Sequence, residues 1–449
     1  MKKYFGTDGI RGISNKDLTP EFACKVAKAG GYILSKESDN KKVLIAKDTR
    51  ISGDMLESAM SSGFKSIGID VETIGIAPTP VLAYLVREEH ADLGVVISAS
   101  HNPYEYNGIK YFNNQGTKIP DEIELEIEKQ IDFPEYEEKI DNTNVGRCMQ
   151  NEEVINKYIK YIKEIFYEDI KDNIKEDFII GVDTANGATY ELAEKIFKEL
   201  NIKYKIINNT PDGKNINQNC GSTNLEQLKK LVLENKLSLG IAYDGDGDRC
   251  LAVDENGKEI NGDTLLAVFS KYMKENNMLK NNSLVCTIMS NLALEEVCKS
   301  NNINLIQTNV GDRYVLEEMQ KNNYNLGGEQ SGHIILSDFN LTGDGIITSL
   351  FFIKIILEKG IQTSKVCSII DAYPQMLINV KVKNYDFKND IDICNKINQI
   401  KLEQNGNCKV LIRKSGTEPL LRIMLEGKDT NYIEKASKEL AKLIEQKLN

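Results

Sequence analysis

Three sets of three short apolar runs constrain the fold of this 449-residue chain more than any other feature of the sequence. Each run ends in a polar turn, and stretches such as 55–66, 188–200 and 293–300 lie between the runs. Apolar residues recur every three or four positions in these stretches, which is typical of amphipathic helices. The alternation of strand and helix predicts mostly parallel sheets covered by helices. The predicted strands are 43–48, 72–78, 93–100, 178–183, 205–211, 239–244, 284–289, 304–310 and 324–329.

The C-terminal part of the chain has a different pattern, in which residues 376–382 predict a strand and residues 432–448 a long helix. We therefore predict an α/β protein with three similar α/β domains, each with a mostly parallel mixed sheet, plus a smaller C-terminal α+β domain, arranged around a central cleft. An ordinary α/β chain gives some such runs by chance, but here each third run is followed by residues suited to chemistry. The predicted domain boundaries are 1–150, 151–254, 255–368 and 369–449.

The amino-acid composition of the chain limits the kinds of molecule that it can bind. The formal net charge of -11 argues against nucleic acid or an anionic membrane as the main partner, but a small anionic substrate stays possible. The nine cysteines are scattered and odd in number, which favours reduced thiols over a disulfide framework or a zinc site. No apolar run follows the first two lysines, and the most apolar stretch, 346–357, is too short to span a bilayer and predicts a buried helix. We expect a cytoplasmic protein.

The third run of the first set leads into a loop that carries a candidate catalytic serine. Ser100 is followed by His101, and Lys110 lies ten residues on. A serine hydrolase would need the pattern Gly-x-Ser-x-Gly, which is absent here. A serine that carries a phosphoryl group, with about two negative charges, fits better. The alternative is that Ser100 only caps a turn.

The third run of the second set leads into Asp244, Asp246 and Asp248, which alternate with glycines. Glycine lets the backbone fold tightly, so the carboxylates can face one point, and oxygen donors select Mg²⁺ or Ca²⁺ over zinc. An EF-hand would need glycine where Arg249 stands and helices at both flanks, whereas the flanks predict strands. A purely structural acidic turn stays open. Mg²⁺ also accepts a phosphate oxygen, which leaves a place for phosphorylated Ser100 as a ligand.

Four further segments supply polar groups for substrate, although each could also be an exposed turn. The segment 413–419 combines a guanidinium, two hydroxyls and bare amides, which suits a phosphate group, and Arg422 follows it. The segment 327–333 offers donors and acceptors for sugar hydroxyls, and 310–314 is similar. The segment 5–12 places a cation in a glycine-rich turn. The candidates in these segments are Arg11, Gly311, Glu329, Ser331, Arg413, Ser415, Gly416 and Thr417.

Four motifs together make the chain similar to the α-D-phosphohexomutases over essentially its whole length. They are Ser-His-Asn-Pro, Asp-Gly-Asp-Gly-Asp-Arg, Gly-Glu-x-Ser-Gly-His and Arg-x-Ser-Gly-Thr-Glu-Pro, in that family's order. The resemblance implies four domains around a deep cleft and a catalytic phosphoserine. It also assigns roles by position: one Mg²⁺ on Ser100, Asp244, Asp246 and Asp248; sugar contacts from Glu329 and Ser331; phosphate contacts from Arg413, Ser415, Gly416 and Thr417; and an acid/base role for Lys110.

The resemblance also implies an activity. The segments 5–12 and 327–334 are similar to the bacterial branch that acts on glucosamine phosphates. We expect reversible conversion of glucosamine 6-phosphate into glucosamine 1-phosphate through a hexose 1,6-bisphosphate, which also acts as activator, for UDP-N-acetylglucosamine synthesis. Lys110 or His101 would move the hydroxyl proton, and Arg11 would supply charge. The alternatives are the same chemistry on mannose or glucose phosphates, a metal-dependent phosphatase, and a non-catalytic binding protein. A homodimer is compatible with the sequence.

Overall fold

The structure is a computed structural model that describes residues 2–6, 8–36, 38, 41–404, 407–414 and 420–448. Contacts divide the chain into two compact units. The first unit comprises Met1–Met289 and Ile303–Ile369, and the second comprises Ser290–Asn302 and Ile370–Asn449. Within the described residues, every helix is too short or too polar to span a lipid bilayer. All nine cysteines are described, and all are free thiols.

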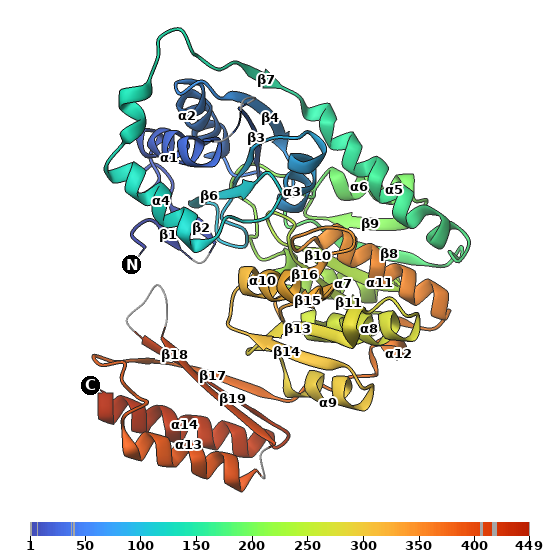
Figure 1. Ribbon diagram of the computed structural model, residues 1–449. Helices are drawn as coiled ribbons and strands as arrows, with labels where there is room; N and C mark the ends of the chain where they lie inside the picture. Colours follow the sequence, from blue (N-terminus) through green and yellow to red (C-terminus); the bar gives the residue numbers. More distant parts are fainter. Residues whose placement is uncertain are drawn as a thin grey trace. The chain divides into compact units, whose positions relative to one another are not determined.

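The first unit begins with a seven-stranded mixed sheet in the order β1-β2-β6-β5-β3-β4-β7 (Figure 1). Its parallel part is made by β3, β4, β5 and β7, whereas β6 pairs antiparallel with β5 and with β2. The strands are β1 (Phe5–Gly6), β2 (Gly9–Ile13), β3 (Lys42–Lys47), β4 (Asp70–Ile76), β5 (Leu93–Ile97), β6 (Tyr106–Asn113) and β7 (Cys148–Gln150). The helices are α1 (Pro20–Leu34), α2 (Gly53–Lys65), α3 (Thr79–Glu88), α4 (Asp121–Asp132) and the short η1 (Glu135–Lys139).

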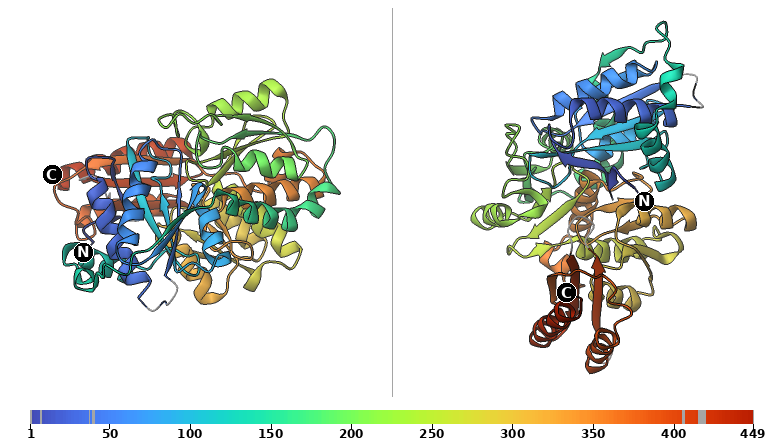
Figure 2. Two further views of the ribbon diagram at one scale, coloured as in Figure 1. Left: turned by 90° about the horizontal axis from the view of Figure 1, so that it is seen from above. Right: turned by 90° about the vertical axis from the view of Figure 1, so that its left-hand side faces the viewer.

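Helices cover both faces of this sheet (Figure 2). Successive side chains of a strand point to opposite faces. Val43 and Ile45 of β3 join one apolar core with residues of α1, α2 and α4. On the opposite face, a Cβ added at Gly94 of β5 would meet Val86 and Leu82 of α3, so α3 packs closely there. Burial on both faces explains why β5 reads as a continuous apolar run.

The second sheet has the order β12-β11-β10-β8-β9. Its elements are η2 (Glu152–Val154), α5 (Ile155–Lys171), β8 (Ile179–Asp183), α6 (Leu192–Glu199), β9 (Lys203–Ile207), η3 (Gly221–Thr223), α7 (Glu226–Asn235), β10 (Leu239–Tyr243), β11 (Cys250–Asp254) and β12 (Glu259–Ile260). The predicted helix at 188–200 is wrong at its start. The amide of Ala188 donates to Gly245 O at 2.8 Å, so this segment forms a turn against another loop before α6 begins.

The third sheet has the order β14-β13-β15-β16. Its strands are β13 (Ser283–Thr287), β14 (Asn304–Thr308), β15 (Leu326–Gly328) and β16 (Ile334–Leu336), and the helical elements of this part are α8 (Gly262–Glu275), η4 (Lys280–Asn282), α10 (Asp312–Asn322), α11 (Gly345–Lys359) and α12 (Thr363–Cys367). The prediction of a buried helix at 346–357 is confirmed, because all but one of those residues of α11 are buried.

The three sheets share one strand order, which confirms the predicted similarity of the three α/β parts. In each, the second strand, the first, the third and an antiparallel fourth lie side by side: β4-β3-β5-β6, β9-β8-β10-β11 and β14-β13-β15-β16. A polar loop joins the third strand to the fourth. We name these loops the serine loop (98–105), the aspartate loop (244–249) and the glutamate loop (329–333). The sequence did not predict strand β6. Lys110 lies on this strand and not in a turn.

The second unit is a three-stranded antiparallel sheet packed on helices, as predicted for the C-terminal part. The strand order is β17-β19-β18. Apolar residues of α13 and α14 share one core with the strands. Helix α9 also belongs to this unit, because the Leu292 amide donates to Glu426 Oε1 at 2.5 Å. The elements are α9 (Leu292–Ser300), β17 (Gln375–Lys381), α13 (Ile391–Glu403), β18 (Cys408–Lys414), β19 (Leu420–Gly427) and α14 (Thr430–Leu448).

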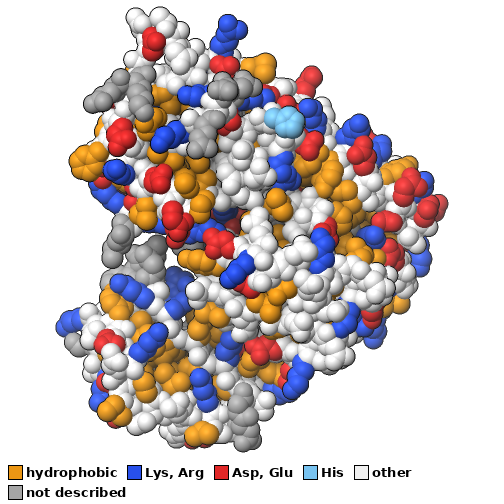
Figure 3. All heavy atoms as spheres, viewed as in Figure 1, with side chains coloured by type: hydrophobic (Ala, Val, Ile, Leu, Met, Phe, Trp, Pro, Cys, Tyr) orange, Lys and Arg blue, Asp and Glu red, His pale blue; other side chains and the backbone are white. Residues whose placement is uncertain are grey.

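Charges on the surface are mixed in sign. On the face shown in Figure 3, lysine and arginine side chains lie among aspartate and glutamate side chains. A nucleic-acid site would need basic side chains gathered along a stripe.

Candidate active site

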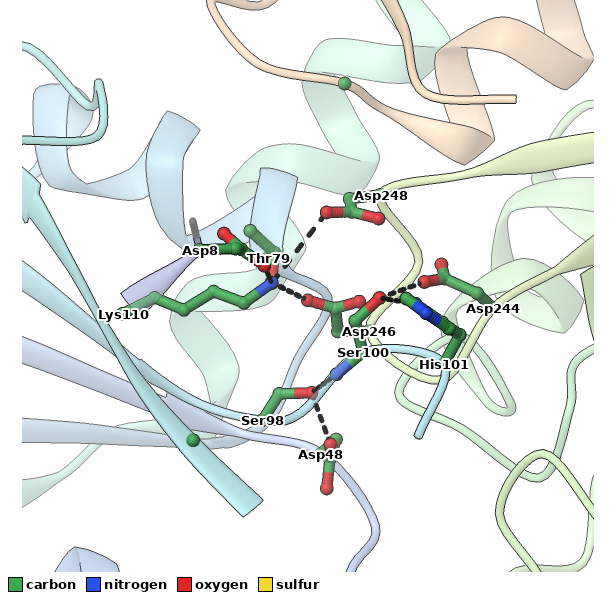
Figure 4. A network of polar contacts seen from close by, with 12 residues as sticks. Asp8, Asp48, Thr79, Ser98, Ser100, His101, Lys110, Asp244, Asp246 and Asp248 are labelled. Carbon is green, nitrogen blue, oxygen red and sulfur yellow. Dashed lines mark hydrogen bonds and ion pairs between the residues drawn. The ribbon is translucent and has the colours of Figure 1, made fainter. Parts of the chain in front are cut away.

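The serine loop holds Ser100 in a constrained backbone conformation. Its φ is +51°, in the left-handed region, which costs a residue with a Cβ about 1–2 kcal/mol. The side chain is buried, and its Oγ donates to Asp244 Oδ2 at 2.6 Å (Figure 4). The Ser100 amide donates to Ser98 Oγ at 2.9 Å. Strain of this kind persists only where the surroundings fix the conformation, and it concentrates at functional sites.

Two side chains from other segments fix the backbone of the serine loop. Arg50 Nη2 donates to Ser100 O at 3.1 Å and to Asn102 O at 2.5 Å. Asn217 Nδ2 donates to the same two carbonyls at 2.9 and 3.1 Å. Arg50 is itself buried and paired with Asp48, which also accepts from Ser98 Oγ. These supporting residues could not be predicted from the sequence, because 48–50 and 217 carry no motif.

The aspartate loop brings its three carboxylates together, as the glycine spacing predicts. One carboxylate oxygen from each of Asp244, Asp246 and Asp248 lies within 4.8 Å of the others, and all three residues are buried. Glycine is required at two positions of the turn. A Cβ at Gly245 would lie 2.5 Å from Ser100 O, and Gly247 has φ +70°. Glycine here therefore lets the aspartate loop approach the serine loop.

The three carboxylates fit a hard divalent cation. Asp246 Oδ1 and Asp248 Oδ1 are buried and lack a hydrogen-bond donor among the described residues. Burial, and then the nearby carboxylates of Asp248 and Asp246, raise the pKa of Asp244 well above its usual range. A dication would offset both the open acceptors and the like-charge repulsion. The EF-hand alternative is excluded, because the loop joins the antiparallel strands β10 and β11 rather than two helices.

Lys110 places a buried cation beside this cluster. Its Nζ lies 2.7 Å from Asp246 Oδ2 and 3.0 Å from Asp8 Oδ2, and only 1% of its side chain is exposed. Burial alone would lower the pKa of Lys110, but the carboxylates of Asp246 and Asp8 raise it above its usual range. The ammonium therefore stays protonated at neutral pH. Arg11 also contacts Asp8, so two of the predicted cations share one carboxylate.

His101 lies next to the serine hydroxyl. Its Nδ1 is 3.2 Å from Ser100 Oγ. Burial, and then the charges of Arg249 and Arg11, lower the pKa of His101 to about 4. The imidazole is therefore neutral at pH 7 and can accept a proton from a neighbouring hydroxyl.

The glutamate loop and the segment before α10 meet in the structure. Glu329 Oε1 accepts from the Gly311 amide at 3.2 Å. Ser331 Oγ is buried and has no hydrogen-bond partner within the described ranges. His333 follows, with Nδ1 3.5 Å from Asp248 Oδ2, so this loop also touches the aspartate loop. The open Ser331 hydroxyl and the Glu329 carboxylate are groups of the kind that bind sugar hydroxyls.

The remaining candidates belong to the second unit. Arg413 of β18 and Arg422 of β19 are cross-strand partners. Arg422 Nε is buried and has no hydrogen-bond partner among the described residues. Burial, followed by the charge of Arg422, lowers the pKa of Arg413. Two adjacent guanidinium groups suit an anion such as a phosphate. Ser415, Gly416 and Thr417 lie outside the described residues.

Several residues of the site were not predicted from the sequence. Thr79, at the start of α3, donates from Oγ1 to Asp246 Oδ2 at 2.6 Å. Asp8 connects Lys110 with Lys118, and Lys118 also contacts Asp312. His333 was read only as part of a motif. Asp8 lies in the segment 5–12 and His333 in the segment 327–333, and this position within a motif is the sequence signal that could have pointed to them.

Family models match four segments of the chain. Phosphoglucomutase/phosphomannomutase alpha/beta/alpha domains I, II and III match residues 2–138, 156–257 and 261–373, and the C-terminal domain of that family matches residues 377–443. The chain belongs to the phosphoglucomutase/phosphomannomutase family. Two relatives, each aligned over the full length of both chains, are phosphoglucosamine mutase of Clostridioides difficile (strain 630), 49% identical, and phosphoglucosamine mutase of Clostridium kluyveri, 50% identical.

Solved phosphohexomutase structures have the same fold. A phosphoglucomutase/phosphomannomutase family protein from Burkholderia thailandensis superposes with a TM-score of 0.81 at 20% identity, covering 100% of this chain and 99% of that one. An N-acetylphosphoglucosamine mutase from Aspergillus fumigatus, solved with GlcNAc-6P and magnesium, gives a TM-score of 0.69 at 17% identity, with 99% and 96% covered. The predicted fold class and family resemblance are therefore confirmed.

Proposed function

We propose that this phosphohexomutase is a phosphoglucosamine mutase, which interconverts glucosamine 6-phosphate and glucosamine 1-phosphate for UDP-N-acetylglucosamine synthesis. Relatives of that name match the whole chain at about half identity. The contact that most directly supports a phosphoserine is the one between Ser100 Oγ and Asp244 Oδ2, at 2.6 Å. It puts the serine at the edge of a carboxylate cluster in which Asp246 Oδ1 and Asp248 Oδ1 have no hydrogen-bond donor among the described residues.

The metal is proposed to be Mg²⁺. Asp244, Asp246 and Asp248, with a phosphate oxygen on Ser100, would hold it, and it would supply positive charge near the transferred phosphoryl group. Thr79 orients Asp246 by donating to its Oδ2. Lys110 contacts the same oxygen, at 2.7 Å.

The reaction moves phosphoryl groups between the serine and the two ends of the sugar. In the first half, the P–O bond to Ser100 Oγ breaks and a P–O bond to the free sugar hydroxyl forms, giving hexose 1,6-bisphosphate. In the second half, Ser100 Oγ takes the phosphoryl group from the other end, and that P–O bond breaks. The proton of each attacking hydroxyl passes to the oxygen that leaves. His101 Nδ1, 3.2 Å from Ser100 Oγ, is placed to take and return this proton.

Fixed positive charge supplies most of the catalysis in this proposal. Negative charge spreads over the equatorial oxygens during phosphoryl transfer, so preoriented cations lower the barrier. Lys110, Arg11 and Arg249 are the proposed cations. Lys110 is buried and Arg249 is half-buried, so their charges are less screened than in bulk water. Hexose 1,6-bisphosphate also acts as activator, because it rephosphorylates a bare serine.

Substrate recognition is divided between two groups of residues. Glu329, Ser331 and Gly311 are proposed to bind the sugar, since Glu329 is oriented by the Gly311 amide and Ser331 Oγ is open. The phosphate that is not transferred would bind Arg413, Ser415, Gly416, Thr417 and Arg422. The register of Arg413 and Arg422 on adjacent strands supports this assignment.

A substrate panel tests the proposal. The purified protein is incubated with Mg²⁺, a trace of glucose 1,6-bisphosphate, and glucosamine, mannose or glucose 6-phosphate in separate reactions followed by phosphorus NMR. We expect the highest kcat/KM with glucosamine 6-phosphate. A preference for mannose or glucose 6-phosphate would contradict the substrate, and release of inorganic phosphate without a 1-phosphate would contradict the mutase reaction.

A further inference from the structure

Six side chains that alternate between acid and base form a closed ring in the first unit. The ring runs in the order Asp248, Lys110, Asp8, Lys118, Asp312, His333 and back to Asp248. The six contacts between neighbours in this order measure 3.8, 3.0, 2.5, 2.5, 3.5 and 3.5 Å. At most a fifth of any of these side chains is exposed. Three members belong to the proposed site or touch its metal ligands, whereas Lys118 has no role in the proposed reaction.

Lys118 occupies the central position between two functional segments. Its Nζ lies 2.5 Å from Asp8 Oδ1 and 2.5 Å from Asp312 Oδ2. Asp8 lies between β1 and β2, and Asp312 is the first residue of α10. Lys118 is 110 positions from Asp8 and 194 positions from Asp312 in the sequence. Lys118 therefore joins the first α/β part of the chain to the third.

Each carboxylate that Lys118 contacts is connected to a proposed site residue. Asp8 contacts Lys110 and Arg11, the cations expected at the transferred phosphoryl group. Asp312 follows Gly311, whose amide donates to Glu329 Oε1. One ammonium thus fixes the distance between the phosphoryl-transfer cations and the sugar-binding carboxylate. Without it, two carboxylates that now share one nitrogen would repel each other.

We propose that Lys118 is a positioning residue of the phosphohexomutase reaction, which aligns the sugar-binding glutamate with the phosphoryl-transfer cations through Asp312 and Asp8. This inference rests on the proposed function. Lys118 does not touch the serine or the metal ligands in any contact described for it. Its effect is geometric, and small displacements of reacting groups have large effects on rate.

A matched control separates positioning from the general effect of removing a partly buried ammonium at this boundary. Lys2 Nζ contacts Asp121 Oδ1 at 2.6 Å and also Glu124, and both carboxylates also contact Arg313. Lys2 therefore lies at the same boundary, beside the ion pairs of Arg313 that join the first and third parts, without touching Asp8 or Asp312. Lys118→Met and Lys2→Met each remove one ammonium from this boundary and keep a side chain of similar length.

The test compares these variants in the full chain with Mg²⁺ and the hexose phosphate that the wild type converts. We expect Lys118→Met to lower kcat/KM by about tenfold to a hundredfold, Lys118→Arg to recover most of that loss, and Lys2→Met to change only the thermal midpoint. Asp312→Asn should not add to the effect of Lys118→Met, because the two residues act as one unit. Equal kcat/KM in Lys118→Met and Lys2→Met, or additive effects with Asp312→Asn, would overturn the proposal.

Hydrogen exchange provides a readout that does not depend on turnover. We expect faster exchange of the Gly311 amide and of the glutamate loop in Lys118→Met, but not in Lys2→Met. Unchanged exchange at both places would also overturn the positioning role. A wild type that converts no hexose phosphate contradicts the proposed function instead, and the exchange experiment still decides the role of Lys118.

Discussion

Replacement of Lys110 by methionine separates the cation's two effects, on metal binding and on catalysis. Lys110→Met keeps an apolar side chain of similar length but removes the ammonium that lies 2.7 Å from Asp246 Oδ2, 3.0 Å from Asp8 Oδ2 and 3.8 Å from Asp248 Oδ2. Two of these carboxylates are proposed metal ligands. In the protein without metal, the variant leaves a buried group of carboxylates with less compensating charge.

The expected magnitudes follow from these contacts. At ~4 Å and an effective dielectric near 20, each contact of unit charges has a gross energy of about 4 kcal/mol, and breaking a buried pair destabilises a protein by about 3–5 kcal/mol. Without metal, Lys110→Met should therefore unfold at a clearly lower temperature. Mg²⁺ no longer competes with the ammonium for Asp246, so its dissociation constant should fall by at least about tenfold, equivalent to ~1.4 kcal/mol. The kcat should fall, since a charge beside the transferred phosphoryl group is lost.

Calorimetric titration with Mg²⁺ and thermal unfolding with and without EDTA measure these effects. Lys354→Met is the matched control, because Lys354 pairs with Asp169 at 2.6 Å and does not contact the proposed site. The control should lose some stability while its Mg²⁺ affinity and kcat stay at the wild-type values. If Lys110→Met binds Mg²⁺ more weakly than the wild type, or equally well, the reasoning from charge competition is wrong.

Two further predictions concern the serine loop and the closed ring of six acidic and basic side chains. Gly245→Ala should lower kcat by about a hundredfold, because the new Cβ would lie 2.5 Å from Ser100 O and must displace the serine. The control is Gly360→Ala, at φ +62° in open space, which should cost about 1–2 kcal/mol of stability and leave kcat unchanged. Equal activities of the two variants would refute the steric argument. Burial alone would raise the pKa of Asp8, but the charges of Lys110 and Lys118 hold it well below its usual range. Ionised Asp8 therefore stabilises the folded protein at pH values above the pKa that this carboxyl has in the unfolded chain, and the stabilisation is lost as pH falls. Asp8→Asn should therefore unfold at a lower temperature than the wild type at pH 7, and this difference should shrink below about pH 4; a difference that grows in acid would contradict the sign.

Much of the fold could be predicted because burial on both faces leaves a strong sequence pattern. Strands such as β5 and β10 are continuous apolar runs, and polar loops follow them directly. Strand β6 was missed because asparagine, glycine and lysine interrupt its apolar residues, although nearly the whole strand is buried. Lysine is rarely buried unless it is paired, so nothing in the local sequence indicates that Lys110 lies inside.

The site could be predicted only where its residues are neighbours in the sequence. Asp244, Asp246 and Asp248 lie in one turn, so their spacing alone indicates a metal site. The contacts of Lys118 with Asp8 and Asp312 join residues from three distant segments. Such contacts depend on how the sheets pack, and a single sequence carries no local signal for them. The domain boundaries and the roles of individual site residues stay predictions.

The central claim is that Ser100 stores the phosphoryl group that is exchanged with the sugar. The most direct measurement is the intact mass and phosphopeptide map of the wild type and of Ser100→Ala after incubation with glucose 1,6-bisphosphate and Mg²⁺. We predict a wild-type species about 80 Da heavier than the bare chain, with the phosphate on Ser100, which is lost on addition of glucosamine 6-phosphate and absent from an inactive Ser100→Ala. A wild type that turns over substrate with Ser100 never phosphorylated, or a Ser100→Ala variant with undiminished mutase activity, would contradict the claim.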